Sequence, residues 1–271
     1  MSSSASSVGV QVLDLHVHSN HSDGKYDPAE VLRLAAAGGI NVLALSDHDL
    51  SPALRPGVHE VEGRQIRVLA AAEVSGAHAG DELHLLVYFP AEPPDAARAF
   101  LRARAAARAQ RFNEAAERLQ LAERASAAAV AGEHSLTRFH LAAALAEEGR
   151  VKRPSDAWSL LQRDTVPLIE FTFVDAIRTA RSWGGLTSWA HPSLADANQH
   201  LATFVAAGLQ GVEGCRPGLP KPTRNGLKRL AKRYNLLLTG GSDFHGWWPG
   251  RLGDFRFEGE HAQAFLARLD A

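Results

Sequence analysis

The stretch Val10-Gln-Val-Leu-Asp-Leu-His-Val-His18 decides the fold class, because its apolar and polar side chains alternate. One face carries Leu13, Leu15 and Val17, and the other carries Asp14, His16 and His18. A period of two residues predicts a β-strand. Residues i and i+2 of a strand point the same way, roughly 6.7 Å apart along the chain. The strand therefore presents two imidazoles that can converge on one metal ion.

Helices and short apolar strands alternate along the chain after this strand. Asp27 followed by Pro28 predicts a helix start, with Asp27 as N-cap, and that helix runs to Gly38-Gly39. Further strands are predicted at 40–45, 65–74, 82–89, 185–190, 211–215 and 236–239. Further helices are predicted at 174–183, 201–207 and 222–234. This rhythm is typical of an α/β fold.

The composition changes between residues 93 and 165, where Ala, Arg and Glu dominate and a helical structure is predicted throughout. The strand and helix rhythm resumes after this stretch. We therefore expect a disordered tail at 1–9 and an α/β body made of 10–92 and 166–271. The helical insert at 93–165 interrupts that body and is interpreted as a lid or substrate-binding element.

Metal-binding side chains follow several of the predicted strands. His48, Glu73, His191, Asp243 and His245 lie at strand ends, His84 lies within a strand, and Asp23 lies in a turn after His16 and His18. In a parallel barrel, the carboxyl ends of the strands gather on one face, where active sites are built. Six histidines and three carboxylates are too many for one ion, since zinc, manganese and iron take about four to six ligands each. Two or three ions are predicted, with a carboxylate such as Glu73 bridging, and paired ions suit phosphoryl chemistry.

Composition excludes several other classes of protein. The formal net charge of −1 over 271 residues gives no global field to hold long DNA or an anionic membrane. The single cysteine, Cys215, rules out a disulfide scaffold and a cysteine-based zinc site. No apolar run is long enough to cross a bilayer, and the Ser-rich start does not have the pattern of a secretory signal. A cytoplasmic location is the resulting expectation.

Four segments together resemble the PHP (polymerase and histidinol phosphatase) family of metal-dependent phosphoesterases. They are Asp14-Leu-His-Val-His18-Ser19, Ser46-Asp-His-Asp49, Ala190-His-Pro192 and Gly241-Ser-Asp-Phe-His245. They occur in the order of the family, and the resemblance spans residues 11–256. It implies a distorted (β/α)7 TIM-like barrel with a trinuclear metal site on the carboxyl face of the strands.

The resemblance also implies a ligand set for each ion. His16, His18, Glu73 and Asp243 would hold the first ion; Glu73, His84 and His191 the second; and Asp23, His48 and His245 the third. Manganese is the expected metal, with iron and zinc as alternatives. The residues expected to be catalytic are His16, His18, Glu73, Asp243 and His245. The mechanism implied is attack of a metal-bridged hydroxide on phosphorus, without a covalent enzyme intermediate.

The chain resembles most closely the bacterial branch that hydrolyses nucleoside 3′,5′-bisphosphates and trims short RNA from its 5′ end. The position of the insert and the segments Arg108-Ala-Gln-Arg111 and Thr137-Arg-Phe-His140 carry this part of the resemblance. The expected substrate-binding residues are Arg108, Arg111, Arg138 and His140. Within the insert, Arg108 and Arg111 follow Arg104 at spacings of four and three residues, so the three share one helix face. Their guanidinium groups suit phosphate oxygens. The alternative is a solvated helix face paired with Glu114 and Glu117.

Three other functions stay open. The first is a phosphatase of histidinol phosphate or another small metabolite on the same fold. The second is a non-catalytic metal-binding module, which missing ligands would favour. The third is a nucleic-acid-binding domain, against which the net charge and the lack of a long basic stripe argue. A small nucleotide or a short RNA is the expected partner, and no membrane is expected. The sequence leaves protein partners unknown.

Overall fold

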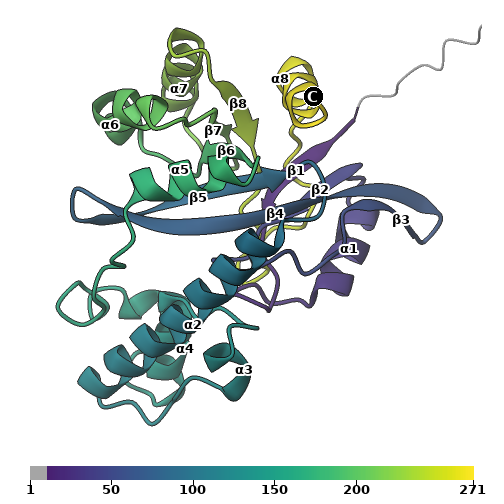
Figure 1. The fold of residues 1–271 in the computed structure, drawn as a ribbon. Coiled ribbons are helices and arrows are strands. Elements are labelled where there is room, and N and C mark those ends of the chain that lie inside the picture. Colours follow the sequence, from purple (N-terminus) through teal and green to yellow (C-terminus); the bar gives the residue numbers. More distant parts are fainter. Residues whose placement is uncertain (1–10) are drawn as a thin grey trace, which may run out of the picture.

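The computed structural model describes residues 11–271, so the predicted disordered tail at 1–9 lies outside the described residues. Eight strands form one sheet. Seven of them follow the order β1 (Leu13–Val17), β2 (Val42–Leu45), β4 (Arg64–His78), β5 (Asp81–Phe89), β6 (Leu186–Trp189), β7 (Gly211–Cys215) and β8 (Leu237–Gly240). The strand β3 (Gly57–Val61) pairs only with β4. Bridges from Val17 to Phe244 and from Leu13 to Phe257 bring the chain after β8 against β1. The sheet is thus a nearly closed barrel, which confirms the predicted fold class (Figure 1).

The strand β5 runs antiparallel to both of its neighbours, β4 and β6, so the expectation of a parallel barrel was wrong at this position. The cause is the two-residue turn Ala79-Gly80, whose φ angles of 48° and 86° join β4 and β5 as a hairpin. Because β5 is reversed, its first half lies at the carboxyl ends of the parallel strands. His84 therefore lies opposite Ser75 and reaches the same face as the other predicted ligands.

Five helices accompany the barrel: α1 (Pro28–Ala37), α5 (Phe173–Ser182), α6 (Leu194–Ala206), α7 (Lys221–Arg233) and α8 (Glu260–Leu269). Asp27 caps α1 as predicted, accepting a hydrogen bond from the Glu30 backbone N–H at 2.8 Å. The helix α6 begins seven residues before the predicted start, because Ser193 caps it directly after Pro192. The strand β3 and the helix α8 were not predicted. Phe265 of α8 meets Tyr88 edge to face in the core, with ring centroids 4.9 Å apart.

The insert contains α2 (Asp95–Arg118), α3 (Ala127–Val130), α4 (Arg138–Glu147) and the short 3-10 helix η1 (Pro154–Ala157). Turns and loops separate these helices, so the expectation of helix throughout was too broad. Leu101 of α2 packs in the core of the barrel, whereas Phe112 of α2 packs with Leu141 and Leu145 in a separate core. The α2–α4 group lies on the opposite side of the sheet from α6 and α7 (Figure 1). Within residues 11–271, no helix combines the length and the apolar character needed to cross a membrane.

Candidate metal centre

Glu73 lies at the centre of a cluster that gathers all nine predicted ligands, and its side chain is almost completely buried. Five imidazoles surround its carboxylate: His16, His18 and His48 at Oε2, and His84 and His191 at Oε1. The nitrogen–oxygen distances lie between 3.1 and 3.3 Å. A carboxylate with imidazoles at both oxygens has the geometry of a ligand that bridges two ions.

Two further carboxylates complete the cluster. Asp243 Oδ1 lies 3.4 Å from His16 Nε2 and 3.3 Å from His18 Nε2. Asp23 lies on the other side of His18, with Oδ1 3.3 Å from His245 Nε2. Four residues each place one ligand atom within 4.8 Å of the ligand atoms of the other three: His18, Asp23, His48 and His245. His18 is thus placed between the group around Glu73 and the group around Asp23.

Six buried ligand atoms of this cluster have no hydrogen-bond partner among the residues that the structure describes. The unpartnered buried atoms here are His16 Nε2, both ring nitrogens of His18, Asp23 Oδ1, His48 Nδ1 and Glu73 Oε2. Leaving a buried polar atom unpaired costs about 1–3 kcal/mol, so a group of them requires a common partner. Divalent cations are such a partner, and a nitrogen and oxygen donor set without sulfur suits manganese, iron or zinc. The residues therefore fit a metal centre with more than one ion.

Without metal, protons compete for the same atoms. Burial lowers the pKa of His18, but the neighbouring carboxylates of Asp243 and Glu73 outweigh it and raise that pKa to about 10. For His84, burial is likewise outweighed by the charge of Glu73, and its pKa rises to about 9. His48 shows the opposite result, because burial dominates and lowers its pKa to about 3. Metal binding must displace the bound protons, so it is expected to weaken at low pH.

The backbone around the cluster is strained and closely packed. His191 and Asp243 adopt positive φ angles of 33° and 53°, in the left-handed region that costs about 1–3 kcal/mol for a residue with a side chain. A Cβ atom on Gly241 would lie 2.3 Å from the Cβ atom of His16. Only a glycine allows the loop after β8 to approach β1 this closely, and that approach places Asp243 against His16.

Glu213 on β7 supports the cluster from behind and is not among the residues predicted from the sequence. Its Oε1 lies 3.1 Å from His16 Nδ1, and its Oε2 accepts a hydrogen bond from the His191 backbone N–H at 2.8 Å. Its side chain has no exposed surface. The signal that could have revealed it is an acidic residue inside the apolar strand 211–215. A carboxylate in this position can orient an imidazole for metal binding.

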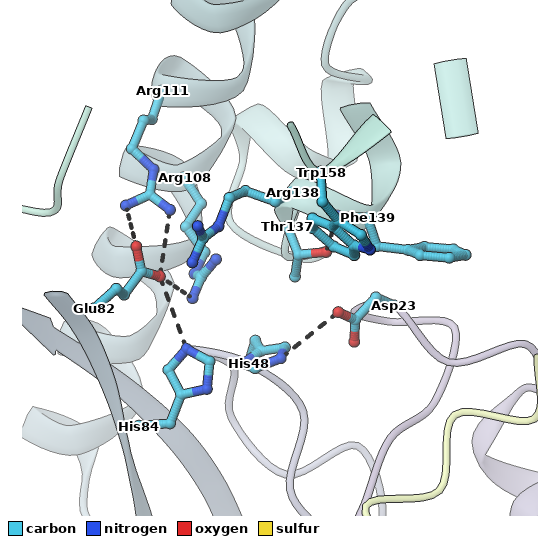
Figure 2. Close-up of a pocket in the computed structure, with 10 residues that line it drawn as sticks. All are labelled: Asp23, His48, Glu82, His84, Arg108, Arg111, Thr137, Arg138, Phe139 and Trp158. Atoms are coloured by element: carbon cyan, nitrogen blue, oxygen red, sulfur yellow. Dashed lines mark hydrogen bonds and ion pairs between the residues drawn. The ribbon is translucent and has the colours of Figure 1, made fainter. Parts of the chain in front are cut away.

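A cavity of about 270 Å³ opens over the Asp23 side of the cluster (Figure 2). Asp23, His48, Glu82 and His84 come from the barrel, and Arg108, Arg111, Thr137, Arg138, Phe139 and Trp158 come from the insert. The insert thus supplies one wall of the cavity. This position is the one expected of a substrate-binding element placed beside a metal centre.

The three cavity arginines differ in their ion pairs. Arg108 is 3% exposed and donates to Asp49 Oδ2 at 2.6 Å and to the Ser75 hydroxyl. Arg111 donates to Glu82 Oε2 at 2.9 Å. Arg138 is exposed and has no ion pair with any residue that the structure describes, and its guanidinium extends into the cavity (Figure 2). A phosphate entering the cavity would therefore meet one unneutralised guanidinium.

His140 lies outside the lining of this cavity. Its Nδ1 accepts a hydrogen bond from the Thr137 backbone N–H at 3.1 Å, as part of a capping box at the start of α4. Burial lowers its pKa, which keeps the ring neutral at physiological pH. In this structure, His140 holds the turn that carries Arg138 and Phe139.

Comparison with known proteins gives three similar bacterial enzymes. A "5′-3′ exoribonuclease" of Haemophilus influenzae is 30% identical, over 86% of this chain and 91% of its own length. A "Phosphoribosyl 1,2-cyclic phosphate 1,2-diphosphodiesterase" of Eggerthella lenta is 32% identical, over 86% and 94%. A "3′,5′-nucleoside bisphosphate phosphatase" of Chromobacterium violaceum is 30% identical, over 89% of each chain.

Solved structures and family models agree with this similarity. The family model described as "PHP domain" matches residues 14–150. A solved Bifidobacterium adolescentis protein superposes with a TM-score of 0.77 at 24% identity, over 95% of this chain and 96% of that one, which shows a shared fold. An amidohydrolase from Chromobacterium violaceum, solved with bound sulfate, superposes with a TM-score of 0.71 at 26% identity, over 92% and 91%.

Proposed function

The chain belongs to the PHP domain family, and from that premise we propose that it is a metal-dependent phosphoesterase of nucleotides. It would remove the 3′-phosphate of nucleoside 3′,5′-bisphosphates and trim short RNA from the 5′ end. The observation that carries this proposal is the cluster around Glu73, which opens into a cavity walled by three arginines. A cytoplasmic location, where nucleotides and RNA ends are produced, is part of the same proposal.

The ligand assignment is part of the proposal. His16, His18, Glu73 and Asp243 would hold one ion; Glu73, His84 and His191 a second; and Asp23, His48 and His245 a third. Bound divalent ions supply Lewis acidity and lower the pKa of water to near neutrality. Manganese is the proposed metal, and the donor set also admits iron and zinc.

The side chains around the metal cluster bind and orient the substrate. Arg138, as the unpaired guanidinium, would bind the phosphate that does not react, and Arg111 would add a second contact beside Glu82. Arg108 holds the cavity wall in place, because its charge is already paired with Asp49. Glu213 fixes the ring of His16 through its Nδ1 and holds the backbone of His191 through its N–H. The proposed residue roles thus separate phosphate recognition from the support of the metal ligands.

Phosphate release tests the proposal directly. Adenosine 3′,5′-bisphosphate, 5′-AMP and histidinol phosphate would be compared with the manganese-loaded protein. We expect fast turnover of the bisphosphate and little of the other two. Turnover of histidinol phosphate instead would favour a small-metabolite phosphatase on the same fold. No release from any phosphoester would contradict the enzyme assignment.

A cyclic phosphodiesterase activity is the second candidate, because the Eggerthella lenta relative is 32% identical over 86% of this chain. Adding phosphoribosyl 1,2-cyclic phosphate to the same panel separates the two candidates. A substrate with a single small sugar would not need the aromatic side chains Phe139, Trp247 and Trp248 beside the cluster.

A further inference from the structure

A ridge of three aromatic side chains borders the metal cluster. Phe139 lies at the start of α4, and Trp247 and Trp248 follow the His245 loop. The ring centroid of Phe139 is 5.3 Å from that of Trp247 and 6.3 Å from that of Trp248. Both tryptophans are about half exposed, at 47% and 56%. Large apolar side chains left in solvent beside a catalytic centre indicate a binding surface.

The ridge is held rigidly against the cluster. The indole N–H of Trp247 donates to the backbone carbonyl of Asp23 at 2.7 Å, while its ring faces Phe139. Trp248 lies edge to face on the imidazole of His245, with centroids 5.6 Å apart. Because Asp23 and His245 are both proposed ligands, the two indoles are fixed relative to the metal centre. A preorganised aromatic surface binds at low cost in conformational entropy.

A second cavity of about 380 Å³ lies on the Trp248 side of the cluster, a volume within the range of small-molecule sites. It is lined by Asp243, His245 and Trp248, together with Phe244, Arg251 and Phe255. It shares no lining residue with the first cavity, which opens onto Asp23, His48 and His84. The two cavities thus meet different parts of the same cluster.

Their chemistry also differs. The first cavity carries three arginines beside Phe139 and Trp158 and suits phosphate, whereas the second carries one arginine, the largely exposed Arg251. Its aromatic rings are those of Phe244, Trp248 and Phe255. A phosphodiester held at the cluster would have a nucleoside on each of its sides. The side that carries a terminal phosphate fits the arginines. The other nucleoside would then lie over the aromatic rings, on which every nucleobase can stack.

We propose that the second cavity is a binding subsite for the nucleoside that follows the scissile phosphate, with Trp248 stacking on its base. The inference rests on the proposed function and deepens it, because only an RNA of two or more nucleotides fills this subsite. A nucleoside bisphosphate ends at the scissile phosphate and leaves it empty. Trp247 is a positioning residue, because its indole N–H links the aromatic ridge to the backbone of Asp23.

The test uses the manganese-loaded full chain and three substrates: a 5′-phosphorylated RNA trinucleotide, the same trinucleotide with no base at its second position, and adenosine 3′,5′-bisphosphate. Stacking of one base is worth about 1–3 kcal/mol, so we expect the intact trinucleotide to exceed the abasic one in kcat/KM by about tenfold. In Trp248→Ala the ratio of kcat/KM for the intact over the abasic trinucleotide should fall close to one. In Trp248→Phe the ratio should stay close to that of the wild type. Leu160→Ala, at an exposed apolar position of the insert, serves as the control and should keep the full ratio.

A binding measurement in EDTA separates this inference from the proposed function. The intact trinucleotide should quench tryptophan fluorescence in the wild type more than in Trp248→Ala. If no substrate is hydrolysed but this quenching is found, the proposed function fails and the base subsite stands. If the substrates are hydrolysed with the same intact-to-abasic ratio in wild type and Trp248→Ala, the base subsite is wrong.

Discussion

Glu213 Oε1 lies 3.1 Å from His16 Nδ1, and neither side chain has any exposed surface. The contact leaves Nε2 of His16 pointing at Glu73 and Asp243, where a metal ion would be bound. A carboxylate behind a ligating histidine fixes both its ring orientation and its tautomer. The β7 strand therefore contributes to the metal centre without offering a ligand of its own.

Glu213→Gln should lower metal affinity while leaving the fold intact. Loss of such a supporting carboxylate typically costs about 10–100-fold in metal affinity or activity. Manganese titration followed by bound-metal analysis measures the effect, and circular dichroism checks the fold. Glu260→Gln, at a largely exposed position, is the matched control. If Glu213→Gln binds manganese as tightly as the wild type, Glu213 does not support the metal ligands.

Arg108→Ala should destabilise the protein strongly. It leaves the fully buried Asp49 carboxylate without its shortest ion pair, and breaking a buried pair from one side costs about 3–5 kcal/mol. Urea unfolding of the metal-free protein measures the loss. Arg153→Ala, which breaks an exposed pair with Asp156 elsewhere in the insert, should change stability little. Similar midpoints for the two variants would mean that Arg108 does not anchor the insert.

Arg138→Ala should affect substrate binding and not stability. The side chain is exposed and makes no ion pair within residues 11–271, so its removal exposes no buried charge. A charged hydrogen bond to phosphate is worth about 1.5–3 kcal/mol, so we expect KM for adenosine 3′,5′-bisphosphate to rise by at least about tenfold. Steady-state kinetics beside thermal unfolding provides both readouts. An unchanged KM would reassign phosphate recognition to another residue.

His78 and His200 should give a pH-dependent part of the stability. Their ring nitrogens lie 3.1 Å apart, and burial together with the charge of His200 lowers the pKa of His78. The unfolded chain then binds this proton more readily than the folded one. The contribution of His78 to the free energy of unfolding is therefore fully present above pH 6.5, the ordinary pKa of histidine. This contribution declines as the pH falls below that value.

Thermal unfolding between pH 7.5 and pH 5 tests this sign. His200→Gln removes the repelling charge, so its melting temperature should fall less on acidification than that of the wild type. A steeper fall in the variant would show that His200 does not oppose the protonation of His78.

The sequence patterns predicted an α/β fold with ligand-type residues at its strand ends, and the resemblance to the PHP family implied the barrel. The alternation in 10–18 and the cap at Asp27 are local patterns, so short-range physics specifies them. The direction of β5 was missed because alternation looks the same in a parallel and an antiparallel strand. Its reversal depends on the turn at Ala79-Gly80.

Long-range pairing could not be predicted from local spacing. Arg108 shares a helix face with Arg111, but the sequence does not show that Asp49, 59 residues away, neutralises it in the interior. Glu213 escaped notice for the same reason, since its partner His16 lies 197 residues away. Contacts of this kind are decided by the closure of the barrel.

If the cluster around Glu73 is a metal centre that hydrolyses phosphoesters, bound metal and activity must rise and fall together. The most direct measurement follows bound metal and phosphate release from adenosine 3′,5′-bisphosphate in the same samples: metal-free protein, manganese-reconstituted protein and reconstituted Asp243→Ala. We expect two to three ions per chain in the reconstituted wild type, activity that returns with them, and a loss of at least about a hundredfold in Asp243→Ala. Full turnover by the metal-free protein, or by a variant that has lost its metal, would show that hydrolysis does not depend on a metal at this cluster.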